Sequence, residues 1–154
     1  MINILSLKTS QLSKKTIEKI LKLKDSHWKK GMISQTNFFN KNISKNDIHI
    51  MLLLKNKLSG YVLLRKKKYI YKNKKLNYLH FDTLIIKKNL RNKKLTPFLM
   101  SYVNNVINIE KKISLLFCDK KMLNFYKIYK WRKVKKNKFK LDYPDNKKLL
   151  LMHS

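Results

Sequence analysis

Hydrophobic positions in the first third of the chain follow a strand period and then a helix period. Residues 2–7 alternate between apolar and polar side chains, which is typical of a strand. From Ser10 to Lys24 the apolar residues recur mostly three or four positions apart, so this segment is predicted to be a helix. The next segment, Asp25 to Phe39, is ambiguous, because Gly31 lies among the aromatic residues Trp28, Phe38 and Phe39. We interpret it as a short second helix with a loop.

The middle of the chain carries strand signals. His49 to Lys55 and Tyr61 to Lys66 are predicted strands, and residues 56–60 between them fit the loop of a hairpin. Tyr69 to Tyr71 can extend the second of these strands. A long strand is then predicted from Leu76 to Lys87.

The last third returns to alternating helices and strands. Residues 97–110 place apolar side chains on one side of a helix, and Ile113 to Cys118 is a short apolar run typical of a strand buried on both faces. Lys120 to Lys130 is predicted to be a helix, and two strands, about 131–142 and 147–153, follow around a turn at 143–146. The predicted order is β-α-α-β-β-β-α-β-α-β-β, a mixed α/β fold.

Size and cysteine content narrow the class of protein. A chain of 154 residues with 44% apolar content is expected to form one domain, residues 1–154, with a core that needs no disulfide. Cys118 is the only cysteine, which fits a reducing compartment. The longest apolar runs, such as Ile50 to Leu54, are too short to cross a bilayer or to form a signal peptide. We therefore expect a soluble, cytoplasmic protein.

The charge is extreme, with a formal net value of +30. Such a charge ordinarily indicates nucleic acid or an anionic membrane as a partner. However, only three of the 38 basic residues are arginines, the side chain best suited to bidentate readout, and the lysines are spread along nearly the whole chain. Lys, Asn and Ile are abundant, whereas Ala is absent and Gly occurs twice, a pattern that codons of an AT-rich genome produce. We interpret the charge as largely compositional, with non-specific attraction of polyanions at low salt.

One junction carries a candidate binding site. The apolar strand end Leu84–Ile86 passes through a basic loop into a helix that opens with Thr96 and Pro97, which we expect to be the N-cap and the first helical residue. Free amides at the positive end of a helix, beside the cations Arg91, Lys93 and Lys94, suit a bound pyrophosphate. The alternative is an ordinary exposed turn in a lysine-rich chain.

The order of elements and two motifs together resemble the GNAT superfamily of acyl-CoA-dependent N-acyltransferases. The family's signature is an apolar strand end, four residues, Gln or Arg, two residues, Gly, one residue, and Gly or Ala; here it maps onto Ile86, Arg91, Lys94 and Thr96. A second motif, Phe-Tyr, three residues, Gly-Phe, corresponds to residues 125–131, where Tyr126 follows Arg91 by 35 positions. The resemblance spans about residue 47 to the end.

This chain departs from the family where small residues are usual. Lysine replaces glycine in both motifs, at Lys94 and Lys130, and Thr96 stands at the other small position. Glycine tolerates positive φ and close approach of a ligand. We therefore expect the loop at Lys94 and Thr96 either to use ordinary helical angles or to hold its ligand more loosely.

The resemblance implies a mostly antiparallel central sheet with helices on both faces, and acetyl-CoA or another acyl-CoA as the cofactor. It also implies that the strand before the loop splays from its neighbour and offers backbone groups of Leu84, Ile85 and Ile86 to the pantetheine arm and the thioester oxygen. The loop amides would hold the pyrophosphate with Arg91; these are the amides of Asn92, Lys93, Lys94, Leu95 and Thr96.

Three side chains are candidates for catalysis. Tyr126 matches the tyrosine that commonly protonates the departing thiolate in the family, although it also lies on the apolar stripe of its helix and can simply pack. His80 and Asp82 lie two residues apart on one strand and so point the same way, where the family often places its base. His80 has the better pKa for a base, and Asp82 could orient it or bind a cationic substrate; a structural histidine is the alternative.

The acceptor is less defined. In the family the first 45 residues shape the acceptor site, and here they offer Trp28, Phe38 and Phe39. We expect a small-molecule amine, with an acidic acceptor easier to attract than a cationic one; a protein amine and a homodimer are left open. His27 and His49 lack neighbouring ligands, so we expect no metal, and Cys118 is expected to act as a small buried hydrophobe. Two alternatives remain: a basic nucleic-acid-binding module, and a degenerate fold that has lost its coenzyme.

Overall fold

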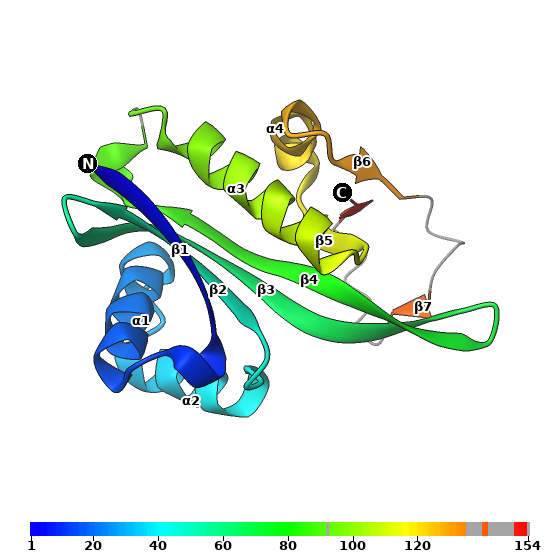
Figure 1. Cartoon of the computed structure of the whole chain (residues 1–154), viewed down its shortest axis with the longest axis horizontal. Helices are drawn as coiled ribbons and strands as arrows, with labels where there is room; N and C mark the ends of the chain where they lie inside the picture. The colour runs from blue at the N-terminus through cyan, green and yellow to red at the C-terminus, as the bar shows by residue number, and fades with distance from the viewer. Residues whose placement is uncertain (92, 135–139, 142–149, 154) are drawn as a thin grey trace.

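The computed structural model describes the chain except for residues 92, 135–139, 142–149 and 154 (Figure 1). Its sheet has the strand order β1-β2-β3-β4-β5-β8-β6, and β7 pairs with β3. The strands are β1 (Ile2–Lys8), β2 (Ile48–Leu54), β3 (Lys57–Tyr71), β4 (Lys74–Ile86), β5 (Ser114–Cys118), β6 (Arg132–Lys133), β7 (Lys140–Leu141) and β8 (Leu150–His153). The helices are α1 (Lys14–Trp28), α2 (Met32–Asn42), α3 (Leu95–Glu110) and α4 (Leu123–Ile128), with 3₁₀ turns at Thr9–Gln11, Lys88–Leu90 and Lys120–Met122.

The predicted order of elements is confirmed. All pairings are antiparallel except that of β4 with β5, which are joined by the crossover through α3. Helices α1 and α2 cover one face of the sheet and α3 and α4 the other (Figure 1). The single strand predicted over 131–142 is wrong, because β6 and β7 in that range pair with different strands, β8 and β3. The strand predicted over 147–153 is present as β8, and the turn predicted at 143–146 lies outside the described residues.

Several predicted boundaries are wrong by a few residues. The first helix begins at Lys14 rather than Ser10, because the hydroxyl of Ser13 accepts a hydrogen bond from the Thr16 amide at 3.1 Å and caps it. The hairpin loop is also shorter than residues 56–60. Lys55 and Asn56 both have positive φ, 49° and 59°, so they form a two-residue turn of the kind that matches the twist of a hairpin.

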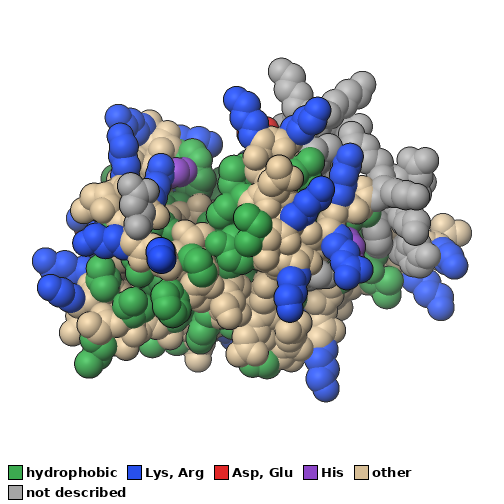
Figure 2. All heavy atoms as spheres, turned by 90° about the horizontal axis from the view of Figure 1, so that it is seen from above, with side chains coloured by type: hydrophobic (Ala, Val, Ile, Leu, Met, Phe, Trp, Pro, Cys, Tyr) green, Lys and Arg blue, Asp and Glu red, His purple; other side chains and the backbone are tan. Residues whose placement is uncertain are grey.

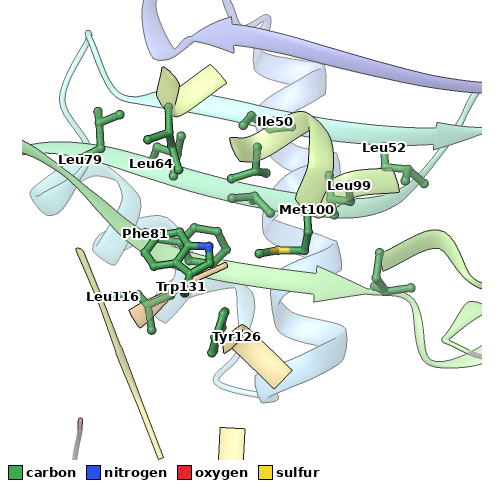
Figure 3. Close-up of a cluster of buried hydrophobic side chains, with 14 of the residues drawn as sticks. Ile50, Leu52, Leu64, Leu79, Phe81, Leu99, Met100, Leu116, Tyr126 and Trp131 are labelled. Atoms are coloured by element: carbon green, nitrogen blue, oxygen red, sulfur yellow. The ribbon is translucent and has the colours of Figure 1, made fainter. Parts of the chain in front are cut away.

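The largest apolar cluster lies between the sheet and α3 with α4. It joins alternate residues of the central strands, such as Ile50, Leu64 and Leu79, to fully buried residues of α3 (Figure 3). A smaller cluster on the opposite face holds Ile20 and Leu23 of α1 against the sheet. Cys118 is buried in the larger cluster with its thiol 3.7 Å from the Met152 sulfur, as expected for a small hydrophobe.

The surface carries the predicted scatter of cations. Figure 2 shows Lys and Arg side chains distributed over the face seen from above, with hydrophobic side chains between them. They do not gather into one stripe in this view.

Candidate functional site

Strands β4 and β5 are paired only over a short segment and then separate. Their parallel pairing is confined to Leu79 with Ser114 and His80 with Leu115, although β4 continues to Ile86 and β5 to Cys118. On its other edge, β4 stays paired with β3 as far as Ile86. Among the described residues, the end of β4 is therefore paired with a strand on one side only, and the sheet opens between β4 and β5.

A bulge accompanies this opening. The register of β3 with β4 steps from Leu63↔Thr83 to Leu64↔Phe81, so that Asp82 has no partner of its own. A bulge increases the local twist and re-aims side chains. Here it places both Asp82 and Thr83 on the side of the sheet covered by α1 and α2, where they line the same cavity.

The backbone at the end of β4 is oriented by its ladder with β3. The Lys87 amide bonds to the Ser59 carbonyl at 2.9 Å, and antiparallel ladders direct alternate residues to opposite edges. The backbone N–H and C=O groups of Ile85, opposite Tyr61, thus point toward β3. Those of Leu84 and Ile86 point toward β5. Of the three residues predicted to offer backbone groups, these two face the opening.

The loop after β4 adopts the backbone that glycine usually supplies. Lys94 has φ 53° and ψ 26°, in the left-handed region, and it is the N-cap of α3. The expectation of ordinary helical angles is therefore wrong at Lys94. Thr96 and Pro97 are the second and third residues of α3 rather than its N-cap and first residue. Proline is still accommodated, because its missing N–H falls in the first turn, where no helical partner exists.

This helix begins without a side-chain cap. No side chain of the described residues caps this helix, so in the described part of the chain the amides of Lys94, Leu95 and Thr96 lack the partner that a cap would give. The Lys93 amide, in contrast, closes a turn on the Leu90 carbonyl at 3.1 Å. Asn92, also predicted to contribute an amide, lies outside the described residues. The positive end of a 16-residue helix is thus open to an anion.

Arg91 ties this loop to the opposite helix layer. Its Nε donates to the Ile86 carbonyl at 3.3 Å, and its Nη2 lies 2.8 Å from Nδ1 of His27, near the end of α1. Burial lowers the pKa of His27, and the Arg91 charge lowers it further. The neutral ring can therefore accept a hydrogen bond from the guanidinium group. This bond anchors the loop that would hold a diphosphate to α1.

The second motif also preserves a glycine-like backbone. Lys130 has φ 68° just after α4. Its amide bonds to the Lys127 carbonyl at 3.0 Å, and the Trp131 amide bonds to the Tyr126 carbonyl at 3.2 Å. This pair of bonds is the Schellman arrangement, which normally ends in glycine. It brings Trp131 back into the core, with 1% exposure.

Tyr126 of α4 lies against Phe81 of β4 and interacts with Cys118 of β5, the two strands that separate at the opening. Its ring is 8% exposed and packs edge-on against Phe81 and Trp131, with centroids 6.0 and 6.3 Å away (Figure 3). Burial raises its pKa to about 12, so the phenol keeps its proton at neutral pH. It can donate that proton, and the packing around its ring holds it in place.

His80 and Asp82 share the α1/α2 side of the sheet, as expected. His80 is 3% exposed between the rings of Tyr78 and Phe117, and burial lowers its pKa to about 4. Asp82 accepts a hydrogen bond from Arg65 Nη1 at 2.8 Å, forming an ion pair whose side chains are only 16% and 6% exposed. His80 is neutral but weakly basic, and Asp82 is engaged with a cation.

A cavity of about 250 Å³ lies where the bulge faces the two N-terminal helices. Its lining includes two of the three predicted aromatics, Trp28 and Phe38, together with Asp82. Phe39 instead packs near His49, 6.0 Å between ring centroids. The remaining lining side chains are Lys24, Lys30, Ser34, Gln35 and Thr83.

The lining residues that were not predicted as site residues are Lys24, Lys30, Ser34, Gln35 and Thr83. Lys24 had a visible signal, since it follows Ile20 by four positions and so lies on the apolar side of α1; it is 7% exposed. Gln35, 4% exposed, had none. Arg65, beneath the cavity, could be placed only from the pairing of β3 with β4.

The described residues contain no group of three or more His, Cys, Asp or Glu side chains placed to hold a metal ion. None of the described helices is both long and apolar enough to cross a membrane.

No family model matches this sequence, and no curated protein matches it. Solved structures do. Escherichia coli ElaA superposes with a TM-score of 0.72 at 18% identity, and an acyl-CoA N-acyltransferase from Pseudomonas aeruginosa with 0.72 at 12%; each match covers 99% of both chains. A PaiA N-acetyltransferase from Thermoplasma acidophilum, crystallised with coenzyme A, matches with 0.58 at 16%, covering 99% of this chain and 98% of its own. The chain has the fold of these acyltransferase structures, as the resemblance implied.

Proposed function

Because the chain has this fold, we propose that it transfers an acetyl or other acyl group from coenzyme A to a primary amine, with donor and acceptor bound together. The attacking nitrogen forms a bond to the thioester carbon, the carbon–sulfur bond breaks, and the amine loses a proton while the thiolate gains one. The chain's part is to bind and orient both partners and to place proton donors and acceptors.

The observation that supports this most is the opening between β4 and β5, which leads directly to the uncapped start of α3. An anionic diphosphate fits the amides of Lys94, Leu95 and Thr96, aligned with the helix dipole. A pantetheine arm can then add to the free edge of β4 through the backbone of Leu84 and Ile86. The left-handed Lys94 supplies the turn that glycine gives elsewhere. The absence of glycine therefore does not by itself remove the site.

Tyr126 is proposed to protonate the departing thiolate. Its phenol is held on the α4 side of the opening and remains protonated at neutral pH because burial raises its pKa to about 12. A thiol needs only modest help to leave, since its own pKa is about 8.5.

Removal of the amine proton does not require a strong base here. His80 can accept a proton but is weakly basic, with a pKa of about 4. The cavity offers a second route, because the cations of Lys24, Lys30 and Arg65 disfavour a protonated amine nearby and so lower its pKa. We propose that the acceptor amine reacts largely in its neutral form, with Asp82 holding Arg65 in place.

Calorimetry distinguishes this proposal from its alternatives. Acetyl-CoA is titrated into the protein at 50 and 200 mM salt, beside a random-sequence DNA duplex. The acyltransferase proposal predicts saturable one-site binding of acetyl-CoA that persists at 200 mM salt, while the duplex loses most of its affinity. Duplex binding without acetyl-CoA binding indicates a nucleic-acid module, and binding of neither at 200 mM salt indicates a degenerate fold.

A further inference from the structure

We propose that the cavity between α1, α2 and the β4 bulge binds an acidic group of the acceptor, a carboxylate or a phosphate, so that the substrate is an anionic amine. This inference rests on the proposed transferase function and adds the substrate class. It is carried by two donors of the cavity wall, a largely buried lysine and a buried amide that has no hydrogen-bond partner in the described part of the chain.

Lys24 is the first of these donors. Its side chain lies in the cavity wall at 7% exposure, and its ammonium is 4.9 Å from the centre of the Phe38 ring. Among the described residues it has no ion pair and no hydrogen bond. Asp82, the carboxylate nearest in the lining, is instead bonded to Arg65 and to the Thr83 hydroxyl. Burial lowers the pKa of Lys24, the Asp82 charge opposes this only in part, and a bound oxyanion would stabilise the ammonium further.

Gln35 is the second donor. It is 4% exposed, lines the same cavity from α2, and its Nε2 has no hydrogen-bond partner in the described part of the chain. Buried polar atoms in folded proteins are rarely left unpaired, so an orphaned amide beside an unpaired ammonium points to a missing acceptor. Carboxylate and phosphate oxygens accept from both.

The charge of the cavity selects against cationic acceptors. Lys24 and Lys30 line it, and Arg65 lies beneath Phe38 with its guanidinium 5.8 Å from the ring centre. The one carboxylate in the lining, that of Asp82, is already neutralised by Arg65. A polyamine would meet like charges here, whereas an acidic amine would gain a partner. Trp28 and Phe38, 41% and 38% exposed, give the remainder of the acceptor an apolar wall.

Binding is tested first with simple anions. The protein has two tryptophans, and Trp131 is 1% exposed, so a fluorescence change on ligand addition reports mainly on Trp28. Inorganic phosphate and acetate are titrated at constant ionic strength, which screens the surface lysines equally throughout. We expect saturable binding of at least one anion, and Lys24→Met, a neutral residue of similar length, weakens it about 10- to 100-fold.

Lys14→Met is the matched control, because Lys14 is an exposed residue at the start of the same helix. It removes the same charge and should change anion affinity less than about twofold. Lys24→Gln is measured beside Lys24→Met, and both are checked by urea unfolding. Equal losses in the Lys14 and Lys24 variants, or no saturable binding in the wild type, overturn the inference.

Turnover measurements then identify which acidic group of the acceptor, phosphate or carboxylate, the cavity binds. Glucosamine 6-phosphate is compared with glucosamine, and L-phenylalanine with its amide, each with acetyl-CoA. We expect the acidic member of one pair to have a kcat/KM at least about tenfold higher, with the preference lost in Lys24→Met. A preference for phosphate or carboxylate distinguishes the two sources, and a preference for both neutral members contradicts the proposal.

Failure of this inference is distinguishable from failure of the proposed function. Acetyl-CoA affinity of Lys24→Met is measured by calorimetry and should match that of the wild type. If acetyl-CoA binds but no anion binding depends on Lys24, the acidic acceptor is wrong and the transferase stands. If anions bind through Lys24 but acetyl-CoA does not bind, the anion site stands and the transferase is wrong.

Discussion

The two faces of the sheet bury different kinds of side chain. Against α3 and α4 the packing is apolar, and no buried charged residue belongs to that cluster. The opposite face buries Lys24, Arg65, His49 and His80, and Arg65 is paired with the partly buried Asp82. Burial of apolar area stabilises a fold, whereas buried charge generally does not unless it is paired.

The two faces therefore differ in role: the apolar face mainly supports the fold, and the polar face carries the groups suited to binding and chemistry. The apolar face holds α3 and α4 rigidly against the sheet, and with them the start of α3 and the phenol of Tyr126. The polar face pairs most of its charges and leaves a few donors for a ligand. We therefore expect stability to depend mainly on the first face, and acceptor choice and sensitivity to acid on the second.

Acid is expected to act through the polar face. His49, bonded to Thr9 and Tyr61 at 2.8 Å, and His80 both have pKa values lowered to about 4 by burial. A histidine in the unfolded chain has a pKa near 6.5, so between pH 6.5 and 4 the unfolded state binds more protons than the folded state. The stability present above pH 6.5 is therefore lost as the pH falls toward 4. The loss is on the order of 3 kcal/mol for each histidine, measured by urea unfolding at constant salt.

The control for this decline is His27→Gln, at an exposed position of α1. It should reduce the slope between pH 6.5 and 4.5 less than His49→Gln does, because His27 is exposed and its pKa is lowered less than that of His49. A wild-type stability that stays flat over this interval contradicts the account of the polar face.

The apolar face is tested by a pair of neighbours in α3. Leu99 is fully buried and Phe98 is 58% exposed. Leu99→Ala should lower the free energy of unfolding by about 3 kcal/mol, because it leaves a cavity in the core. Phe98→Ala should change it by less than about 0.5 kcal/mol. Equal effects in urea unfolding would show that α3 does not pack as described.

Tyr126 lies where the apolar face meets the opening. Tyr126→Phe keeps the ring and removes only the hydroxyl, so we expect turnover to fall about tenfold to a thousandfold with little change in acetyl-CoA affinity. Thiol release is measured against any accepted amine. Tyr102→Phe, a partly buried tyrosine of α3, is the matched variant and should retain turnover. Undiminished turnover in Tyr126→Phe removes its proposed role.

The smallest expected effect concerns the loop. Lys94→Gly should raise the free energy of unfolding by about 0.5 kcal/mol, because relief of left-handed strain of about 1 kcal/mol exceeds the entropy lost to a more flexible unfolded chain. Lys93→Gly removes the same charge at a neighbour outside the left-handed region, so it should not stabilise. Destabilisation by both would contradict the backbone geometry assigned to Lys94.

Much of this fold was predictable because hydrophobic spacing sets the order of elements, and the opening, the loop and Tyr126 follow from motifs in that order. The backbone conformation of Lys94 and Lys130 was not predictable from the sequence. Lysine has no preference for positive φ, and tertiary packing and the Schellman bonds impose it on a chain poor in glycine.

The cavity between α1, α2 and the β4 bulge could not be predicted from the sequence either. Whether Arg65 meets Asp82 depends on the register of β3 with β4, and a single-residue bulge at Asp82 changes which face each later side chain takes. The pairing of charges across strands thus requires the structure, whereas the burial of Lys24 could have been read from its place on the apolar side of α1.

The most direct test is a crystal structure of the protein grown with coenzyme A. The account predicts the diphosphate against the amides of Lys94, Leu95 and Thr96, and the pantetheine arm between β5 and the backbone of Leu84 and Ile86. Coenzyme A bound elsewhere, or β4 and β5 paired as far as Ile86 with solvent at the start of α3, would contradict it.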